Sequence, residues 1–150
     1  SIMIMEIKRI STEETYAVRQ PVLRAGRPIE DCFFEYDDHH LSIHFCIELD
    51  GKVISVLSAL PIQSKIFPKL KAMRIRGIAT LDQFQRLGYG SKLVRYAEEE
   101  LKKNGIELLW LNSRISASEF YLKLGYKPKG DTFNIDGIGI HQKFFKSLVV

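Results

Sequence analysis

The sequence has no long hydrophobic run, and its apolar stretches are short. Residues 53–62, one of the longest of them, are interrupted by Ser55 and Ser58. A membrane-spanning helix needs about 20 consecutive apolar residues, so no membrane segment is expected. Residues 1–5 are apolar but have no basic leader and no cleavage site, which argues against a signal peptide. The sequence therefore predicts a cytoplasmic protein.

Cysteine is also scarce. Cys32 lies in a polar stretch and Cys46 in an apolar strand pattern, and the sequence has no others. These dissimilar settings favour two reduced thiols over a disulfide framework. No cysteine or histidine spacing matches a zinc site, so no metal is expected.

The composition is that of an ordinary globular chain. Its 150 residues fit a single domain, 1–150, with 45% hydrophobic and 27% charged residues. The net charge is +4 and the sequence pI about 9.1. No basic stripe with interleaved aromatic residues accompanies this charge, so no nucleic-acid partner is expected, and a phosphate-bearing cofactor explains the surplus equally well.

Residue periodicity predicts a sheet with helices on both sides. Strands are expected at residues 5–10, 42–49, 52–61, 72–80, 107–112, 126–129 and 138–145. Helices are expected at residues 12–24, with Pro21 as a candidate break, then from 88 to a stop at Gly105, and from 116, capped by Ser116, to about 124. Ser11 and Glu14 form a capping-box pattern before the first helix. The dipeptide at residues 50–51 is Asp-Gly, a strong hairpin signal.

The most informative segment joins the strand at 72–80 to the long helix. Its sequence from residue 85 is Gln-Arg-Leu-Gly-Tyr-Gly, followed by Ser91. A helix N-terminus offers unpaired backbone N–H groups and a partial positive charge, and glycine lets a ligand approach closely. The segment therefore suits a pyrophosphate, although Gly88 and Gly90 also suit a tight turn with close helix packing. It is neither a P-loop nor a dinucleotide fingerprint, because Leu93 stands where the third glycine would be.

Two spaced motifs resemble those of the GNAT superfamily of acetyltransferases. Gln85-x-x-Gly88-x-Gly90 resembles the family's acetyl-CoA signature, [QR]-x-x-G-x-[GA]. Residues 111–114 and 120–126 resemble its second half, N-x-x-A-x-x-F-Y-x-K-x-G-F. Ile78-Ala79-Thr80 resembles the end of the family's fourth strand, and with it the match covers about residues 70 to 130 in the family's order.

The resemblance implies a fold and a cofactor. The fold is α/β, of the α+β kind, with a mostly antiparallel central sheet splayed between strands four and five and helices on both faces. The cofactor is acetyl-CoA as co-substrate. The residues implied to bind it are Ile78, Ala79, Thr80, Gln85, Arg86, Leu87, Gly88, Tyr89, Gly90, Ser91, Asn112, Ala117, Phe120 and Lys123.

The resemblance also implies a general acid, Tyr121, whose phenol would protonate the departing thiolate. Some members use a glutamate of the fourth strand as general base, but this sequence has Arg74 and Arg76 there. Arg76 either holds a substrate carboxylate or forms a structural ion pair. The remaining candidates for the base, or for substrate contacts, are Glu48, His44 and His141.

The stretch Asp136-Gly137-Ile138-x-x-His141 resembles a bacterial subgroup of the family whose substrate is undefined, and it favours histidines near the acceptor site. The predicted activity is acetyl transfer from acetyl-CoA to a primary amine of a small molecule or protein, by direct attack. The alternative is a CoA-binding or regulatory module of the same fold without robust catalysis. A homodimer is compatible with the sequence, which does not specify the oligomeric state.

Overall fold

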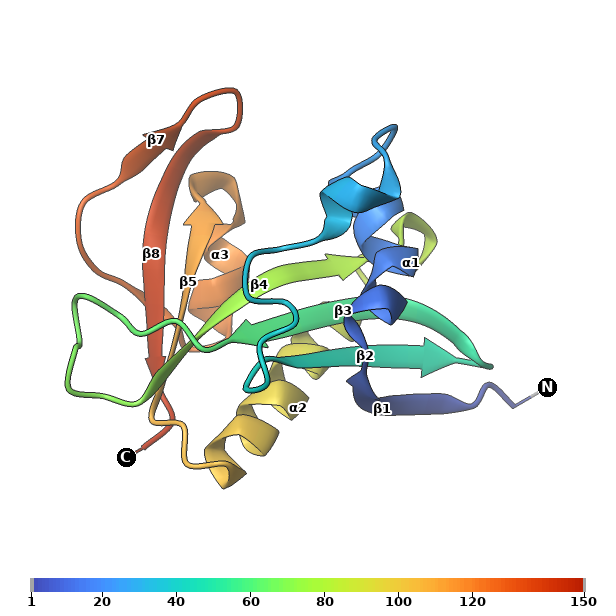
Figure 1. Cartoon of the computed structure of the whole chain (residues 1–150), viewed down its shortest axis with the longest axis horizontal. Helices are drawn as coiled ribbons and strands as arrows, with labels where there is room; N and C mark the ends of the chain where they lie inside the picture. The colour runs from blue at the N-terminus through green and yellow to red at the C-terminus, as the bar shows by residue number, and fades with distance from the viewer. Residues whose placement is uncertain (1, 150) are drawn as a thin grey trace. The chain divides into compact units, whose positions relative to one another are not determined.

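The computed structural model describes residues 2–149 (Figure 1). The elements follow in the order β1 (Met5–Ile10), α1 (Thr12–Leu23), η1 (Ile29–Cys32), β2 (Ile43–Leu49), β3 (Lys52–Leu60), β4 (Ala72–Thr80), η2 (Asp82–Phe84), α2 (Tyr89–Lys103), β5 (Leu108–Arg114), η3 (Ile115–Ala117), α3 (Ser118–Lys123), β6 (Lys127–Pro128), β7 (Phe133–Ile135) and β8 (Gly139–Ser147). All strands belong to one mixed sheet, as the sequence predicted.

Residue contacts divide the chain into two compact units, each built from two stretches of chain. Unit 1 comprises Ser1–Pro61 and Ile75–Glu100, and unit 2 comprises Ile62–Arg74 and Leu101–Val150. Strand β4 and helix α2 therefore contribute residues to both units.

In unit 1, β1, β2 and β3 form an antiparallel meander, and the strand order continues to β4. Asp50 and Gly51 join β2 to β3 with φ values of 48° and 81°. Two successive positive φ values are typical of a type I′ hairpin turn, which confirms the prediction from the Asp-Gly pair.

Helices cover both faces of the unit 1 sheet. Neighbouring residues of a strand point to opposite faces. On β2, His44 hydrogen-bonds Thr12 of α1, whereas the ring of Phe45 lies edge-on to that of Tyr96 of α2, with centroids 5.9 Å apart. Helices α1 and α2 therefore pack on opposite faces.

Helix α1 begins as predicted and runs through its proline. The Ser11 Oγ accepts from the Glu14 N–H, and a Glu14 carboxylate oxygen accepts from the Ser11 N–H, which together make a capping box. Pro21 lies inside the helix, which ends at Leu23, so the expected break is absent. A proline only two residues before the end of a helix disturbs few of its hydrogen bonds.

Helix α2 buries the stripe that its periodicity predicts. Leu93, Val94, Ala97 and Leu101 are each at most 2% exposed. The helix ends at Lys103, and Gly105 follows with a φ of 83°, the left-handed conformation that favours glycine after a helix.

In unit 2, β4 and β5 form the only parallel pair among the strand pairings described. The ladder joins Ala72–Arg74 to Leu108–Trp110, which is three residue pairs. Strand β8 pairs antiparallel with β5, β6 and β7. The sequence predicted β8 but not the three-residue β7.

The two faces of the unit 2 sheet are distinguished by neighbouring residues of β8. Phe145 packs with Trp110 and with the apolar side chains of the 62–70 loop, so that loop covers one face. Phe144 lies against the ring of Tyr121 of α3, with centroids 6.0 Å apart, so α3 covers the other. The helix expected from 116 is shorter than predicted. It follows the 3-10 turn Ile115–Ala117, and Ala117, not Ser116, is its N-cap residue, without a side-chain cap.

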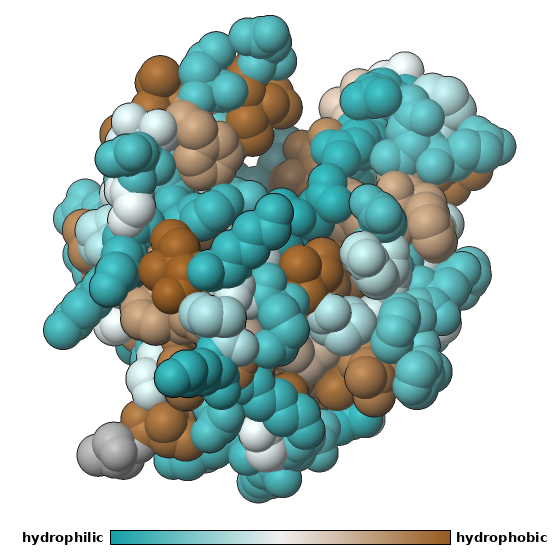
Figure 2. All heavy atoms as spheres, turned by 60° about the vertical axis from the view of Figure 1, so that its left-hand side comes forward, coloured by the Kyte–Doolittle hydropathy of each residue, from teal (hydrophilic) through white to brown (hydrophobic). Residues whose placement is uncertain are grey.

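No helix within residues 2–149 combines the length and apolar character that a membrane crossing requires. On the face drawn in Figure 2, hydrophobic side chains lie in small groups between hydrophilic ones. Scattered apolar residues of this kind are normal on a protein surface.

Candidate functional site

Unit 1 holds the predicted cofactor loop, and its backbone is left-handed at two positions. Arg86 has a φ of 62° and Gly88 a φ of 87°. The Gln85 side chain donates to the Thr80 carbonyl at 2.9 Å and to an Asp82 carboxylate oxygen at 3.2 Å. Gln85 therefore fixes the loop to the end of β4 and to η2, rather than pointing freely toward a ligand.

The loop presents backbone donors without partners. Of the turn and cap hydrogen bonds described, none has its donor between residues 86 and 91, and the first at the helix start runs from Lys92 N–H to the Gly88 carbonyl at 3.1 Å. The first turn of α2 contains no acidic residue. A Cβ placed on Gly88 would have no heavy atom within 4 Å, so open space lies beside its backbone. These features fit an anion such as a pyrophosphate.

The end of β4 leads into this loop. Ala79 is buried, while Ile78 and Thr80 are partly exposed. The Thr80 hydroxyl lies 2.8 Å from the Ser55 hydroxyl of β3, and the Ser55 hydroxyl also donates to the Ala79 carbonyl at 3.3 Å. The tip of the strand is thus held in place by side chains of its own unit.

The remaining predicted cofactor residues lie in unit 2. Asn112 is partly buried on β5, and its side-chain oxygen accepts from Lys143 Nζ at 3.0 Å. Ala117 ends η3, and Phe120 lies on α3 with its ring 5.0 Å from that of Tyr121. Lys123 is exposed and pairs with Glu119 at 3.3 Å. A ligand of Lys123 would have to compete with that carboxylate.

Tyr121 sits on α3 between aromatic rings. Its ring centroid lies 6.0 Å from those of Tyr126 and Phe144. Burial raises the pKa of Tyr121 to about 12. Among the hydrogen bonds found in residues 2–149, none involves its hydroxyl. The side chain is therefore a protonated phenol at neutral pH with its donor uncommitted.

His44 belongs to a buried polar network in unit 1 that the sequence did not predict. Its Nδ1 lies 2.6 Å from the Ser58 hydroxyl, and its Nε2 lies 3.0 Å from the Asp37 carbonyl and 3.2 Å from the Thr12 hydroxyl. Arg19 donates to both carboxylate oxygens of Asp37, at 2.6 and 2.9 Å, and also to Ser58 at 2.8 Å. Both ring nitrogens of His44 are therefore engaged within the protein.

The network has a weak sequence signal. Arg19 points inward from α1, and helical periodicity would have placed it beside Val18 and Thr15 on the buried side. A fully buried arginine needs a buried carboxylate, and the acidic stretch at residues 35–38 offered one. Arg19 and Asp37 lie 18 residues apart, and neither residue predicts the network unless both are considered together.

The other two candidates for the base differ in their surroundings. Glu48 lies on β2 and forms an ion pair with Lys8 at 3.0 Å. His141 lies on β8 with its side chain 7% exposed, and its Nδ1 donates to the Gly139 carbonyl at 2.9 Å. A carbonyl partner fixes the proton on Nδ1, which leaves the Nε2 lone pair available.

Arg76 stacks on an aromatic ring. Its guanidinium lies 4.2 Å from the centroid of Phe34, whose ring also has Arg19 at 3.8 Å and Arg24 at 5.6 Å. Burial, with the charges of Arg24 and Arg19, lowers the pKa of Arg76. Within residues 2–149 Arg76 forms no salt bridge, so a structural ion pair does not account for it.

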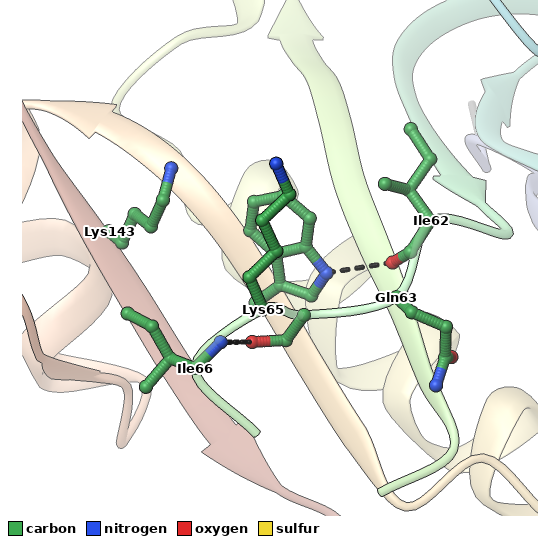
Figure 3. Close-up of a pocket in the computed structure, with 7 residues that line it drawn as sticks. Ile62, Gln63, Lys65, Ile66 and Lys143 are labelled. Carbon is green, nitrogen blue, oxygen red and sulfur yellow. Dashed lines mark hydrogen bonds between the residues drawn. The ribbon is translucent and has the colours of Figure 1, made fainter. Parts of the chain in front are cut away.

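Unit 2 contains a pocket whose lining residues were not among the predicted site residues, although the sequence reasoning placed the acceptor pocket at residues 26–40, 63–71 and the last strands. Its volume is about 310 Å³, and it lies between the loop preceding β4 and the strands β5 and β8 (Figure 3). It is lined by Ile62, Gln63, Ser64, Lys65, Ile66, Trp110 and Lys143. The Trp110 indole N–H donates to the Ile62 carbonyl at 2.8 Å, which fixes the ring as one wall. A strand containing Trp110 was predicted, but the loop that folds against it has no sequence signature.

Comparisons with known proteins agree with the fold. The sequence profile described as the acetyltransferase (GNAT) family matches residues 4–126. The uncharacterised N-acetyltransferase YitI of Bacillus subtilis (strain 168) is 37% identical over 145 residues, covering 97% of both chains.

Solved structures share the fold at lower identity. The ribosomal-protein-S18-alanine N-acetyltransferase of Escherichia coli aligns with a TM-score of 0.75 and 18% identity over 98% of this chain and 96% of that one. An aminoglycoside 6'-N-acetyltransferase in complex with coenzyme A aligns with a TM-score of 0.73 and 14% identity, over 97% and 98%. The long family match and the full-length relative together identify the chain as a member of the acetyltransferase (GNAT) family, whose acetyl donor is acetyl-CoA.

Proposed function

We propose that this acetyltransferase acetylates a primary amine by direct attack on acetyl-CoA, with Tyr121 as the general acid. The observation that carries the proposal is the state of Tyr121, a phenol whose pKa of about 12 keeps it protonated and whose hydroxyl makes no other hydrogen bond among the described residues. Acid catalysis requires a donor that holds its proton until the leaving group needs it.

The cofactor loop fits the phosphates of CoA. Unpaired N–H groups, a first helical turn without acidic residues and the exposed Arg86 favour a pyrophosphate at the start of α2. We propose that residues 86–91 hold this group, that the backbone of residues 78–80 and Asn112 contact the pantetheine arm, and that Ala117, Phe120 and Lys123 border it. The bound donor supplies an acetyl thioester.

His141 is the general base in this proposal. Its Nδ1 proton is fixed by the Gly139 carbonyl, so its Nε2 can take a proton from the incoming amine. His44 has both nitrogens engaged, and Glu48 neutralises Lys8, so neither is used. An ammonium substrate loses two protons overall and the departing sulfur gains one from Tyr121, so one proton is released per turnover.

The acid and the base lie on different faces of the unit 2 sheet, so the reacting thioester is proposed to lie beyond Trp110, where β5 no longer pairs with β4 and a bound group can meet side chains from both faces. Tyr121 packs against Phe144. His141 lies on the other face with Phe145, because alternate residues of β8 point to the same face.

Arg76 is proposed as a further contact for a negatively charged group of the acceptor, because its charge is not neutralised by a carboxylate.

The test is release of CoA thiol from acetyl-CoA in the presence of a broad panel of primary amines. Direct attack predicts intersecting lines in double-reciprocal plots, whereas parallel lines would indicate a covalent acetyl-enzyme. Tight binding of acetyl-CoA without thiol release from any amine would support the alternative of a CoA-binding module.

A further inference from the structure

We infer that the pocket between Trp110, Lys143 and the 62–66 loop binds a carboxylate-bearing acceptor with an apolar side chain, a molecule resembling an amino acid. This inference rests on the proposed function, since it names the class of amine that the enzyme acetylates. None of the predicted cofactor residues lines this pocket, so acetyl-CoA binding does not explain its charge and shape.

The polar part of the pocket is cationic. Lys143 and Lys65 line it, and none of the seven lining residues is acidic. Burial, together with the charges of Arg74 and Lys65, lowers the pKa of Lys143. Within residues 2–149 neither lysine forms a salt bridge. A half-buried ammonium without a counter-ion favours an anionic ligand.

The apolar part gives the ligand its second feature. Trp110, Ile62 and Ile66 contribute hydrophobic surface, and Trp110 is held rigid by its bond to the Ile62 carbonyl. Figure 3 shows Lys143 and the side chains of the loop around this space. Ligand pockets span about 300–1,000 Å³, so a volume of about 310 Å³ favours a small molecule.

The pocket lies beside the proposed base. Residues 141 and 143 of β8 point to the same face, and Phe133 contacts both, at 5.7 Å from the His141 ring centroid and 4.8 Å from Lys143 Nζ. Two residues along a strand span about 7 Å. An amine next to a carboxylate would therefore approach His141 when Lys143 holds the carboxylate.

The pocket is also linked to the cofactor strand. Lys143 Nζ donates to the Asn112 side chain at 3.0 Å, and the same ammonium lies 5.3 Å from the Trp110 ring. Asn112 is proposed to contact the pantetheine arm. A ligand held by Lys143 is thus next to a residue of the proposed donor site within the same unit.

The experiment uses the fluorescence of Trp110, which is the only tryptophan of the chain and lines the pocket. The probes are leucine, 4-methylpentanoate, which lacks the amine, and 3-methylbutylamine, which lacks the carboxylate. We expect leucine and 4-methylpentanoate to give saturable changes, with 3-methylbutylamine binding at least about tenfold more weakly. Equal binding of all three probes would overturn the inference.

Variants identify the cation. Lys143→Met should weaken leucine binding by about tenfold or more, and Lys143→Arg should retain most of it. Lys69→Met is the matched control, because Lys69 is an exposed lysine of the same loop that does not line the pocket. If Arg76→Met abolishes leucine binding while Lys143→Met behaves like the control, the carboxylate is held by Arg76 and the inference is wrong.

Thiol release separates this inference from the proposed function. Equal acetylation of 3-methylbutylamine and leucine would keep the amine acetyltransferase and reject the carboxylate. Leucine binding that depends on Lys143, without acetylation of any amine, would keep the pocket as a ligand site and reject the proposed function.

Discussion

Arg19 donates to both carboxylate oxygens of Asp37, at 2.6 and 2.9 Å, and both side chains are fully buried. The pair connects α1 to the loop that precedes β2, and through Ser58 it reaches β3. Asp37 also accepts from the Phe34 N–H at 2.7 Å, which places the Phe34 ring under the guanidinium. One buried carboxylate thus organises the first part of unit 1.

We expect Asp37→Asn to lower the free energy of unfolding by about 3–5 kcal/mol, because it leaves the buried Arg19 charge uncompensated. Urea denaturation measures this change. Asp31→Asn is the control, since Asp31 pairs with Arg27 near the surface and such a pair contributes at most about 1 kcal/mol. Equal effects of the two substitutions would contradict a structural role for the buried pair.

We expect Gly88→Val to abolish acetyl-CoA binding, as measured by calorimetry. The added side chain enters the open space beside the cofactor loop, and the positive φ adds strain of about 1–2 kcal/mol. Gly51→Val is the matched control, because Gly51 has a similar φ of 81° and equally open surroundings in the β2–β3 hairpin. Wild-type affinity in Gly88→Val would remove the pyrophosphate assignment.

Tyr121→Phe should lower turnover by about 100-fold or more and leave acetyl-CoA affinity nearly unchanged. The pH dependence has a defined sign. Because the pKa of Tyr121 is raised to about 12, the protonated acid persists as the pH rises past 10, the ordinary range of a tyrosine. A loss of turnover in wild type near pH 10 that disappears in Tyr121→Phe would show an ordinary pKa. Unaltered turnover in Tyr121→Phe would exclude it as the acid.

Neither cysteine should react with a thiol reagent at pH 8 in the native protein. Cys32 and Cys46 are free and fully buried, and burial raises the pKa of both thiols, that of Cys46 to about 11. A raised pKa and burial together make the reactive thiolate scarce at pH 8 for both residues. Two equivalents should react after unfolding in guanidinium chloride, and rapid native labelling would contradict the described burial.

The sequence predicted the elements whose signals are local. The capping box of Ser11, the hairpin at Asp50 and the buried stripe of α2 each depend on residues within a turn or two of one another. Strand β7 has three residues, too few for a period to show, and Ser116 resembled a helix cap although a 3-10 turn occupies its place.

The site residues likewise divide into those with a local sequence signal and those without one. The cofactor loop and Tyr121 were predicted from motifs in the sequence, and their roles stay predictions. The Arg19–Asp37–His44 network and the Lys143 pocket depend on side chains that meet only after folding. Arg76 and His44 were both substrate candidates from sequence alone. In the structure both ring nitrogens of His44 are hydrogen-bonded within the protein, whereas Arg76 stacks on the ring of Phe34.

Because unit 1 ends at Glu100 and unit 2 begins at Ile62, the two units interleave along the chain. A ribosome must release residues 62–74 of unit 2 before the last part of unit 1 is made. Neither unit is a contiguous fragment, so a nascent chain cannot finish one before starting the other. The hydrogen-bond partners of the Arg19–Asp37 pair all lie in the first stretch of unit 1, so these bonds can form during synthesis before β4 is made.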